Sequence, residues 1–113
     1  MCSQQELTTV LTELSQNLRA LFGRHLREVI LFGSYAHGDA DDGSDVDVMV
    51  LVDLSREGIV GYRRNVAEIS GKLLLTHNVL ISPIVENQAF FARYCADLLF
   101  YRSINREGVR LSA

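Results

Sequence analysis

The sequence predicts a small α+β domain in which helices cover a mixed β-sheet. Two observations support this fold class. Apolar residues recur at three- and four-residue intervals in three segments, and three short apolar runs between them are bounded by turn residues. The 113 residues suit a single domain (1–113), and the apolar fraction of 48% is enough for a packed core. The expected order is helix, strand, strand, helix, strand, helix.

In the first half, a helix is expected from Ser3 to Gly23, because apolar side chains recur at helical spacing from Leu7 to Phe22. Ser3 and Glu6 fit a capping box at its start. A strand over 27–32 follows, because this apolar run is too short for a helix. The next strand, from about 45 to 52, is apolar on both faces beyond its first residues, which is typical of a central strand.

In the second half, apolar spacing predicts a helix from Ile59 to about His77, followed by a strand over 79–85. Pro83, near the end of that strand, indicates an edge strand or a bulge. Asn87 is a good cap for a third helix, and Gly108 is expected to end the helical region. One side of this third helix would carry the apolar residues Phe91, Tyr94, Leu98 and Tyr101.

Composition excludes several classes of protein. The net charge of −3 and the isoelectric point near 5.5 argue against direct nucleic-acid binding, which normally uses a basic face. No apolar run approaches the roughly 18–20 residues that span a bilayer, so no membrane association is expected. Cys2 and Cys95 are interpreted as free thiols, and no secretory signal is recognisable. These features predict a cytoplasmic protein.

The segment 33–50 carries the residues best suited to chemistry. Asp45 and Asp47 open the second strand, and because side chains alternate along a strand they project from the same side. Two such carboxylates suit Mg²⁺, and Mn²⁺ as well. Gly33 and Ser34 form a turn after the first strand, where the backbone can approach a phosphate and the hydroxyl can bond it. The segment therefore predicts a metal and nucleotide site.

The loop between the Gly33-Ser34 turn and the two aspartates contains residues that have more than one interpretation. Asp39, Asp41 and Asp42 suit solvation and turn formation better than metal binding. For His37, a phosphate contact and an exposed loop position are equally good interpretations.

The segment resembles the signature of the nucleotidyltransferase superfamily that includes DNA polymerase beta, and more closely its minimal nucleotidyltransferase branch. In that signature ten residues separate Gly-Ser from Asp-x-Asp, and here residues 35–44 supply the same spacing. Ser44 before the first aspartate and the carboxyl end, 104–108, also resemble small members. The resemblance covers nearly the whole chain and implies the nucleotidyltransferase fold.

The resemblance implies Mg²⁺-dependent transfer of a nucleoside monophosphate, most often AMP, from ATP or another nucleoside triphosphate to an acceptor hydroxyl. Asp45 and Asp47 would hold the metal. The phosphates would be held by Gly33, Ser34, His37 and Ser44. In the minimal branch the acceptor is often a protein, and members act as antitoxins by adenylylating a small helical partner of the HEPN class, a ribonuclease toxin.

The chain departs from the family at two positions. His37 stands where many relatives have an arginine, and the third strand carries no acid where active members commonly have a third carboxylate. Ser82 best matches that third position, and Glu86, just past the strand, is the alternative. Two other functions therefore stay open. One is a nucleotide-binding partner module with weak or no catalysis, and the other is transfer to a small molecule such as an aminoglycoside, with the pocket completed by a homodimer.

Overall fold

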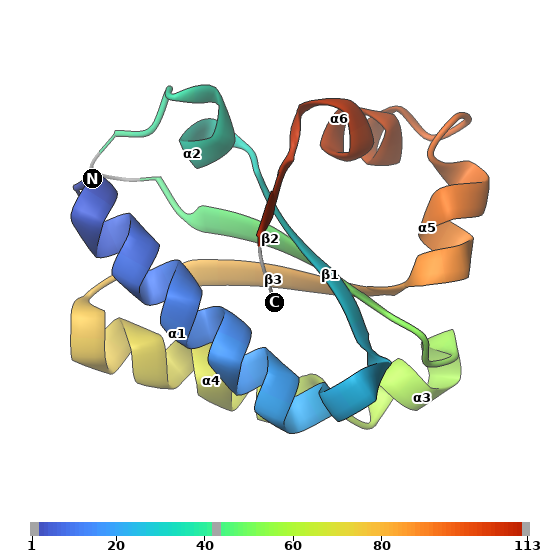
Figure 1. Cartoon of the computed structure of the whole chain (residues 1–113), viewed down its shortest axis with the longest axis horizontal. Helices are drawn as coiled ribbons and strands as arrows, with labels where there is room; N and C mark the ends of the chain where they lie inside the picture. The colour runs from blue at the N-terminus through green and yellow to red at the C-terminus, as the bar shows by residue number, and fades with distance from the viewer. Residues whose placement is uncertain (1–2, 42–43, 112–113) are drawn as a thin grey trace.

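The computed structural model describes residues 3–41 and 44–111, so Cys2 and Asp42 lie outside the described residues. Figure 1 shows helices on both sides of one sheet. The helices are α1 (Gln4–Phe22), α2 (Ser34–His37), α3 (Arg56–Val60), α4 (Arg63–His77), α5 (Gln88–Tyr94) and α6 (Leu99–Glu107), with a 3-10 turn, η1 (Gly23–His25), after α1. The strands are β1 (Leu26–Phe32), β2 (Val46–Val52), β3 (Ile81–Asn87) and β4 (Val109–Leu111).

The sheet has the strand order β3-β2-β1-β4. Strand β1 is antiparallel to both β2 and β4, whereas β2 and β3 are parallel. The expected small mixed sheet covered by helices is confirmed. Strand β3 lies at one edge, which agrees with the edge position that Pro83 indicated.

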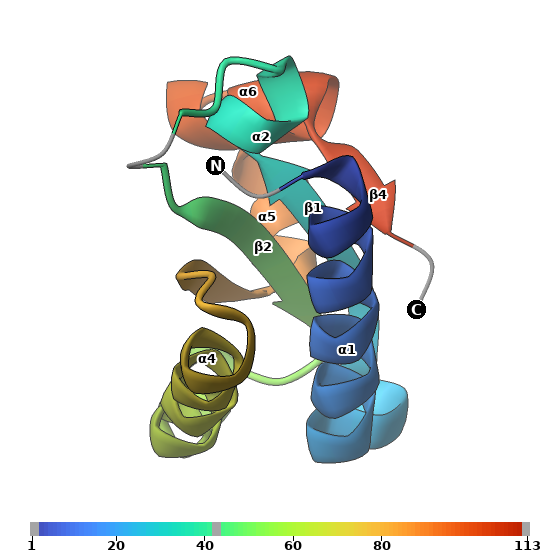
Figure 2. The same ribbon diagram turned by 90° about the vertical axis from the view of Figure 1, so that its left-hand side faces the viewer.

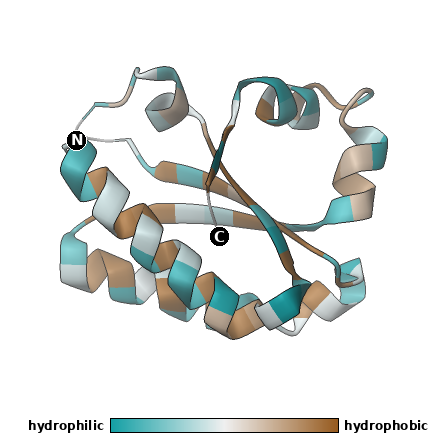
Figure 3. Cartoon of the chain, viewed as in Figure 1, coloured by the Kyte–Doolittle hydropathy of each residue, from teal (hydrophilic) through white to brown (hydrophobic). Residues whose placement is uncertain are grey.

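The first face of the sheet packs against α1 and α4, as Figures 1 and 2 show. Strand β2 contributes every second residue to it, and these four valines are fully buried: Val46, Val48, Val50 and Val52. They join Leu14 and Leu18 of α1 and Leu73 of α4 in the larger core cluster. Figure 3 shows brown apolar positions recurring along both helices and through the strands. This continuous apolar layer covers the first face of the sheet.

The second face of the sheet is only partly covered. Helices α5 and α6 place Phe91 and Ile104 over Ile30, Met49 and Leu51 in a smaller core cluster. Because residues two apart in a strand share a face, Asp47 lies on the same side as Met49. This face is therefore apolar near the end of β2 and acidic near its start.

The two expected helices in the second half are each divided. Residues 59–77 contain α3 and α4 instead of one helix, because the chain turns at Gly61 and Tyr62. The C-terminal helix is likewise interrupted between α5 and α6. Phe91 and Ile104 both contact the smaller cluster, whereas one straight helix would hold them roughly 20 Å apart. Packing on the sheet thus requires the break.

Two strands also differ from expectation, one in its bounds and one in being present. Strand β3 runs over 81–87 instead of 79–85, and β4 was not expected at all. Gly108 ends α6 as predicted, and a Cβ atom there would overlap Ile30, so the chain enters β4 where only glycine fits. A three-residue strand is too short for periodicity to reveal. Among the described helices, none is long and apolar enough to cross a membrane.

Candidate functional site

Gly33 links the end of β1 to the single turn of α2 and lies against the acidic residues of β2. Its backbone has φ 75° and ψ −152°, a conformation that favours glycine. A Cβ atom at this position would lie 2.5 Å from Oδ2 of Asp47. The absence of a side chain therefore lets the Gly-Ser turn approach the Asp47 carboxylate closely.

Asp45 and Asp47 form an acidic pair at the start of β2. Burial, followed by the neighbouring charge of Asp45, raises the pKa of the Asp47 carboxyl above its ordinary value. Across the described ranges 3–41 and 44–111, no salt bridge reaches either aspartate. The protein thus holds two carboxylates near each other without supplying a cation to balance them.

Ser82 lies beside this pair. It is the parallel partner of Asp47 in the β2–β3 ladder, and its hydroxyl donates a hydrogen bond to Oδ2 of Asp45 at 3.0 Å. The position nearest the two aspartates on β3 therefore carries a hydroxyl.

Glu86 lies roughly 13 Å further along β3, judged from the rise of a strand over four residues. It is buried, and its Oε1 accepts a hydrogen bond from the Tyr101 hydroxyl at 2.7 Å. Its Oε2 accepts from the backbone N–H of Asn87 and lies 3.4 Å from Nε of Arg56. Burial and the bond to Glu86 raise the pKa of Tyr101 to about 12. The structure brings Ser82, and not Glu86, to the aspartates.

The two remaining residues of the expected phosphate site have partners within the protein. Nε2 of His37 lies 2.8 Å from Oε2 of Glu107, which connects α2 to the end of α6. The Ser44 hydroxyl accepts from the Asp41 backbone N–H at 2.9 Å and donates to the Asp41 carboxylate at 3.2 Å. In this arrangement His37 joins two helices and Ser44 shapes the loop before β2.

Comparison with known proteins identifies the family. The family model for the nucleotidyltransferase domain matches residues 11–110, nearly the whole chain. The chain belongs to the nucleotidyltransferase domain family. The expected class of enzyme, a transferase of the nucleotidyl type, is confirmed by this match.

Several relatives of this nucleotidyltransferase carry more specific names. "Putative protein adenylyltransferase MJ0141" of Methanocaldococcus jannaschii is 35% identical over 80 residues, which cover 71% of this chain and 79% of the relative. "Protein adenylyltransferase MntA" of Thermococcus cleftensis is 42% identical over 50 residues, covering 44% of this chain and 48% of the relative.

One similar solved structure is a crystal structure described as a toxin-antitoxin with AMP-PNP, with a TM-score of 0.58. It is 19% identical, and the match covers 90% of this chain and 72% of that chain. A crystal structure described as a putative nucleotidyltransferase from Sulfolobus solfataricus is also similar, with a TM-score of 0.52 and 19% identity, and the match covers 96% of this chain and 87% of that chain. Likeness at this identity shows the fold alone, and the nucleotidyltransferase fold expected from the sequence is confirmed.

The acidic pair of this nucleotidyltransferase fits a magnesium ion. Mg²⁺ is commonly bound by one or two carboxylates together with water and substrate phosphates. Asp45 and Asp47 supply two oxygen ligands, and the described residues hold no group of three or more His, Cys, Asp or Glu side chains that could enclose a metal. The donor set thus suits an ion shared with a phosphate-bearing substrate. Burial and, after it, the charge of Asp45 raise the pKa of Asp47, and a cation would offset that neighbouring charge.

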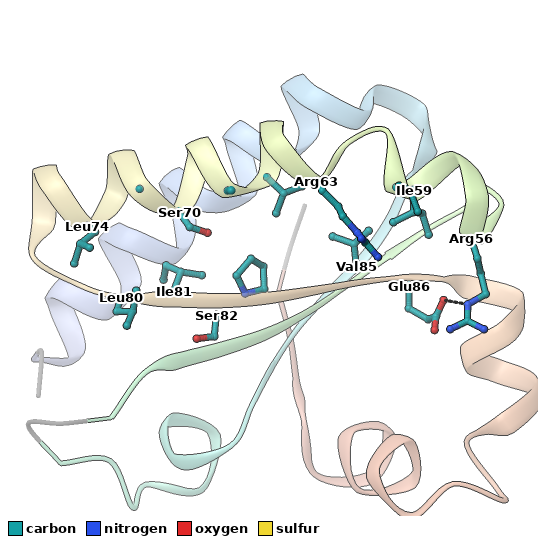
Figure 4. A pocket seen from close by; sticks show the side chains of 15 residues that line it. Arg56, Ile59, Arg63, Ser70, Leu74, Leu80, Ile81, Ser82, Val85 and Glu86 are labelled. Carbon is teal, nitrogen blue, oxygen red and sulfur yellow. Dashed lines mark ion pairs between the residues drawn. The ribbon is translucent and has the colours of Figure 1, made fainter.

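Sequence reasoning missed a groove on the other side of β3 from the acidic pair. It lies between α4 and β3, has a volume of about 840 Å³, and reaches Ser82 (Figure 4). Arg63 lines this groove together with Ser70 and Gly71. The available signal was one face of the helix, because each of its residues lies three or four positions from another of them and three are small: Arg63, Ala67, Ser70, Gly71 and Leu74.

Proposed function

We propose that this nucleotidyltransferase moves AMP from ATP to a hydroxyl group on a partner protein. The observation that carries the proposal is the acidic pair of Asp45 and Asp47, which has no salt bridge within the described chain and lies against the backbone of Gly33. Such a site is suited to a triphosphate and the cation that accompanies it. The printed names of the relatives, which specify adenylyl transfer to protein, support the choice of AMP and of a protein acceptor.

Each site residue has a role in this reaction. Gly33 and Ser34 hold the outer phosphates, with His37 available to them if it leaves Glu107, while Ser44 keeps the loop before β2 in place. Asp45 and Asp47 hold Mg²⁺, or Mn²⁺, which when bound neutralises charge on the phosphates. The hydroxyl of Ser82 holds one oxygen of Asp45 and so orients that carboxylate.

In the transfer step, the acceptor oxygen forms a bond to the α-phosphorus of ATP. The bond from the α-phosphorus to the oxygen that bridges the α- and β-phosphates breaks, and pyrophosphate leaves with the electron pair. The hydroxyl proton passes to solvent or to a nearby carboxylate. Catalysis depends chiefly on positioning and on balancing charge, as in other phosphoryl transfers.

The partner proposed here is a small helical toxin of the HEPN class, with this chain as its antitoxin. The similar structure described as a toxin-antitoxin with AMP-PNP supports a paired role of this kind.

A second function is favoured by one observation. Ser82 occupies the position beside the aspartates where a third carboxylate would activate the acceptor. A nucleotide-binding module that acts by contact with its partner would need no such carboxylate.

Labelled ATP distinguishes the two functions. The chain is incubated with α-labelled ATP, Mg²⁺ and a small helical protein of the HEPN class, and label on the protein is measured. We expect transfer by the wild type and a loss on the order of 100-fold or more in Asp45→Asn/Asp47→Asn. The control Glu57→Gln/Glu68→Gln removes the same charge from exposed positions of α3 and α4 and should transfer normally. ATP binding by the wild type without any transfer would overturn the enzyme and favour the binding module.

A further inference from the structure

We propose that the groove between α4 and β3 binds a segment of the acceptor protein. That segment carries an acidic side chain and an apolar side chain, and it presents the hydroxyl to Asp45 and Asp47. This inference rests on the proposed function and specifies how the acceptor is recognised. It follows from the groove's shape, its unsatisfied polar groups and its position beside Ser82.

The groove has room for side chains of another molecule. Its volume of about 840 Å³ lies within the range of about 300–1,000 Å³ that is typical of ligand sites. A Cβ atom built on Gly71 would meet nothing within 4 Å, so this part of α4 borders open space. Val66, Ile81 and Val85 make the walls apolar, which favours an apolar side chain as the occupant.

Ser70 adds a polar requirement to the same wall. Its hydroxyl is buried and has no hydrogen-bond partner among the residues that the structure describes. A buried polar group without a partner is unfavourable, by about 1–3 kcal/mol in typical cases. A backbone or side-chain polar group of an occupant would satisfy it, and Figure 4 shows the Ser70 oxygen on the groove side of α4.

Arg63 supplies the charge that selects an acidic occupant. Two arginines line one end of the groove, but Arg56 is already paired with Glu86 and stacks over the Phe90 ring at 4.1 Å. Arg63, by contrast, makes no ion pair within residues 3–41 and 44–111, and it extends into the groove toward Val85 (Figure 4). An acidic side chain of the acceptor would balance it.

Ser82 connects the groove to the reacting groups. It lines the groove at the free edge of β3, and its hydroxyl, which Figure 4 shows turned away from α4, bonds Asp45 on the other face of the sheet. An occupant that crosses this edge at Ser82 therefore reaches the acidic pair. Val85, toward which Arg63 extends, lies roughly 10 Å along the strand from Ser82. In an extended segment this distance separates residues about three positions apart. The acidic residue of the acceptor is therefore expected about three positions from the hydroxyl residue.

Recognition depends on side chains more than on strand addition. The carbonyl of Leu80 accepts from the Val46 N–H, so alternate residues of β3 turn their backbone groups to β2 and the others face the free edge. Pro83 is among the residues that face outward, and it has no N–H to donate. A continuous ladder with an added strand is interrupted there, which is a usual protection of edge strands. Specificity then comes from Arg63, Ser70 and the apolar walls.

A peptide library tests the charge requirement. Each peptide carries a fixed Tyr, Ser or Thr, with Glu or Lys placed at every position up to five residues away, and labelled AMP is measured after incubation with ATP and Mg²⁺. We expect the wild type to favour Glu over Lys about three positions from the hydroxyl by roughly tenfold or more. Arg63→Glu should reverse that preference. The matched control Arg64→Glu changes the adjacent residue, which does not line the groove, and should behave as the wild type.

A second pair of variants tests the space in the groove. Gly71→Leu should fill it and raise the KM for the best peptide roughly tenfold or more with little change in kcat, because it removes binding alone. Gly71→Ala, at the same position, should leave the KM close to that of the wild type. Affinity for ATP, measured by calorimetry, should be unchanged in all four variants.

The outcomes separate this inference from the proposed function. Absence of transfer to any peptide and to the partner protein would overturn both. Transfer to the partner protein but to no peptide would overturn recognition of a linear segment while leaving the function intact. Transfer to peptides with the same charge preference in Arg63→Glu as in the wild type would overturn the groove as the acceptor site. Loss of ATP affinity in the groove variants would assign the groove to the nucleotide instead.

Discussion

The two ends of strand β2 each hold aspartate, but the protein treats their charges in opposite ways. After the end of the strand, Asp53 accepts hydrogen bonds from Nδ1 of His25 at 2.6 Å and from Nη2 of Arg27 at 2.8 Å. These two bonds lower the pKa of Asp53 below its ordinary value. At the start of the strand, burial and the charge of Asp45 raise the pKa of Asp47.

This difference separates an acid that the fold uses as a structural partner from two acids that it leaves without a basic partner. Near the end of β2, His25 of η1 and Arg27 of β1 both hold the carboxylate of Asp53, so the chain itself supplies partners for this acid. At the other end, the described residues offer the two aspartates only the hydroxyl of Ser82. The acids at the start of the strand are therefore the ones suited to a cation from outside the chain. Three experiments test this contrast between the two ends of β2.

The largest effect is expected at Gly33. Gly33→Ala and Gly23→Ala both place alanine where φ is positive, 75° and 57°, so each should lower the free energy of unfolding by about 1–3 kcal/mol. Only the new Cβ at position 33 meets Asp47, whereas at position 23 nothing lies within 4 Å. We therefore expect Gly33→Ala alone to weaken Mg²⁺–ATP binding, by roughly tenfold or more. Urea denaturation and calorimetry measure the two quantities, and equal ATP affinities would contradict the prediction.

A smaller effect with opposite signs is expected for the aspartates. Asp47→Asn removes a charge that the fold disfavours, so the melting temperature at pH 7 without added metal should stay the same or rise slightly. Asp53→Asn removes the acceptor of two charged hydrogen bonds, so the melting temperature should fall slightly. Thermal denaturation of both variants beside the wild type measures this. A fall for Asp47→Asn as large as that for Asp53→Asn would remove the distinction between the two ends.

The smallest effect is the pH dependence of Asp53. Its pKa is lower in the fold than its ordinary value of 3.8, so it contributes stability above that value. The contribution is lost as the pH falls through the lower pKa of the folded state. The difference in melting temperature between wild type and Asp53→Asn should therefore persist from pH 6 to pH 4 and vanish in more acidic solution. A difference that stays constant down to pH 2 would show that the carboxylate charge contributes nothing.

The accuracy of the sequence-based prediction varies along the chain. The alternation of valines in β2 and the leucine spacing of α1 reveal both elements, because each pattern follows from local backbone geometry. The break between α5 and α6 could not be seen, since its cause is the position of Ile30 and Met49 beneath the two helices. The pair of His37 and Glu107 was equally hidden, because 70 positions separate the two residues along the chain.

By itself the sequence determined the family and the placing of two carboxylates on one side of a strand, since both depend on residue types at short, fixed spacing. Only the tertiary structure decided which residue of β3 stands beside them. Ser82 and Glu86 share a face of that strand, and the register of the β2–β3 ladder puts Ser82 opposite Asp47 and Glu86 opposite Leu51. The apolar pattern determines which side chains share a face, but it does not choose between two residues on the same face, and that choice depends on how the whole strand packs in the sheet.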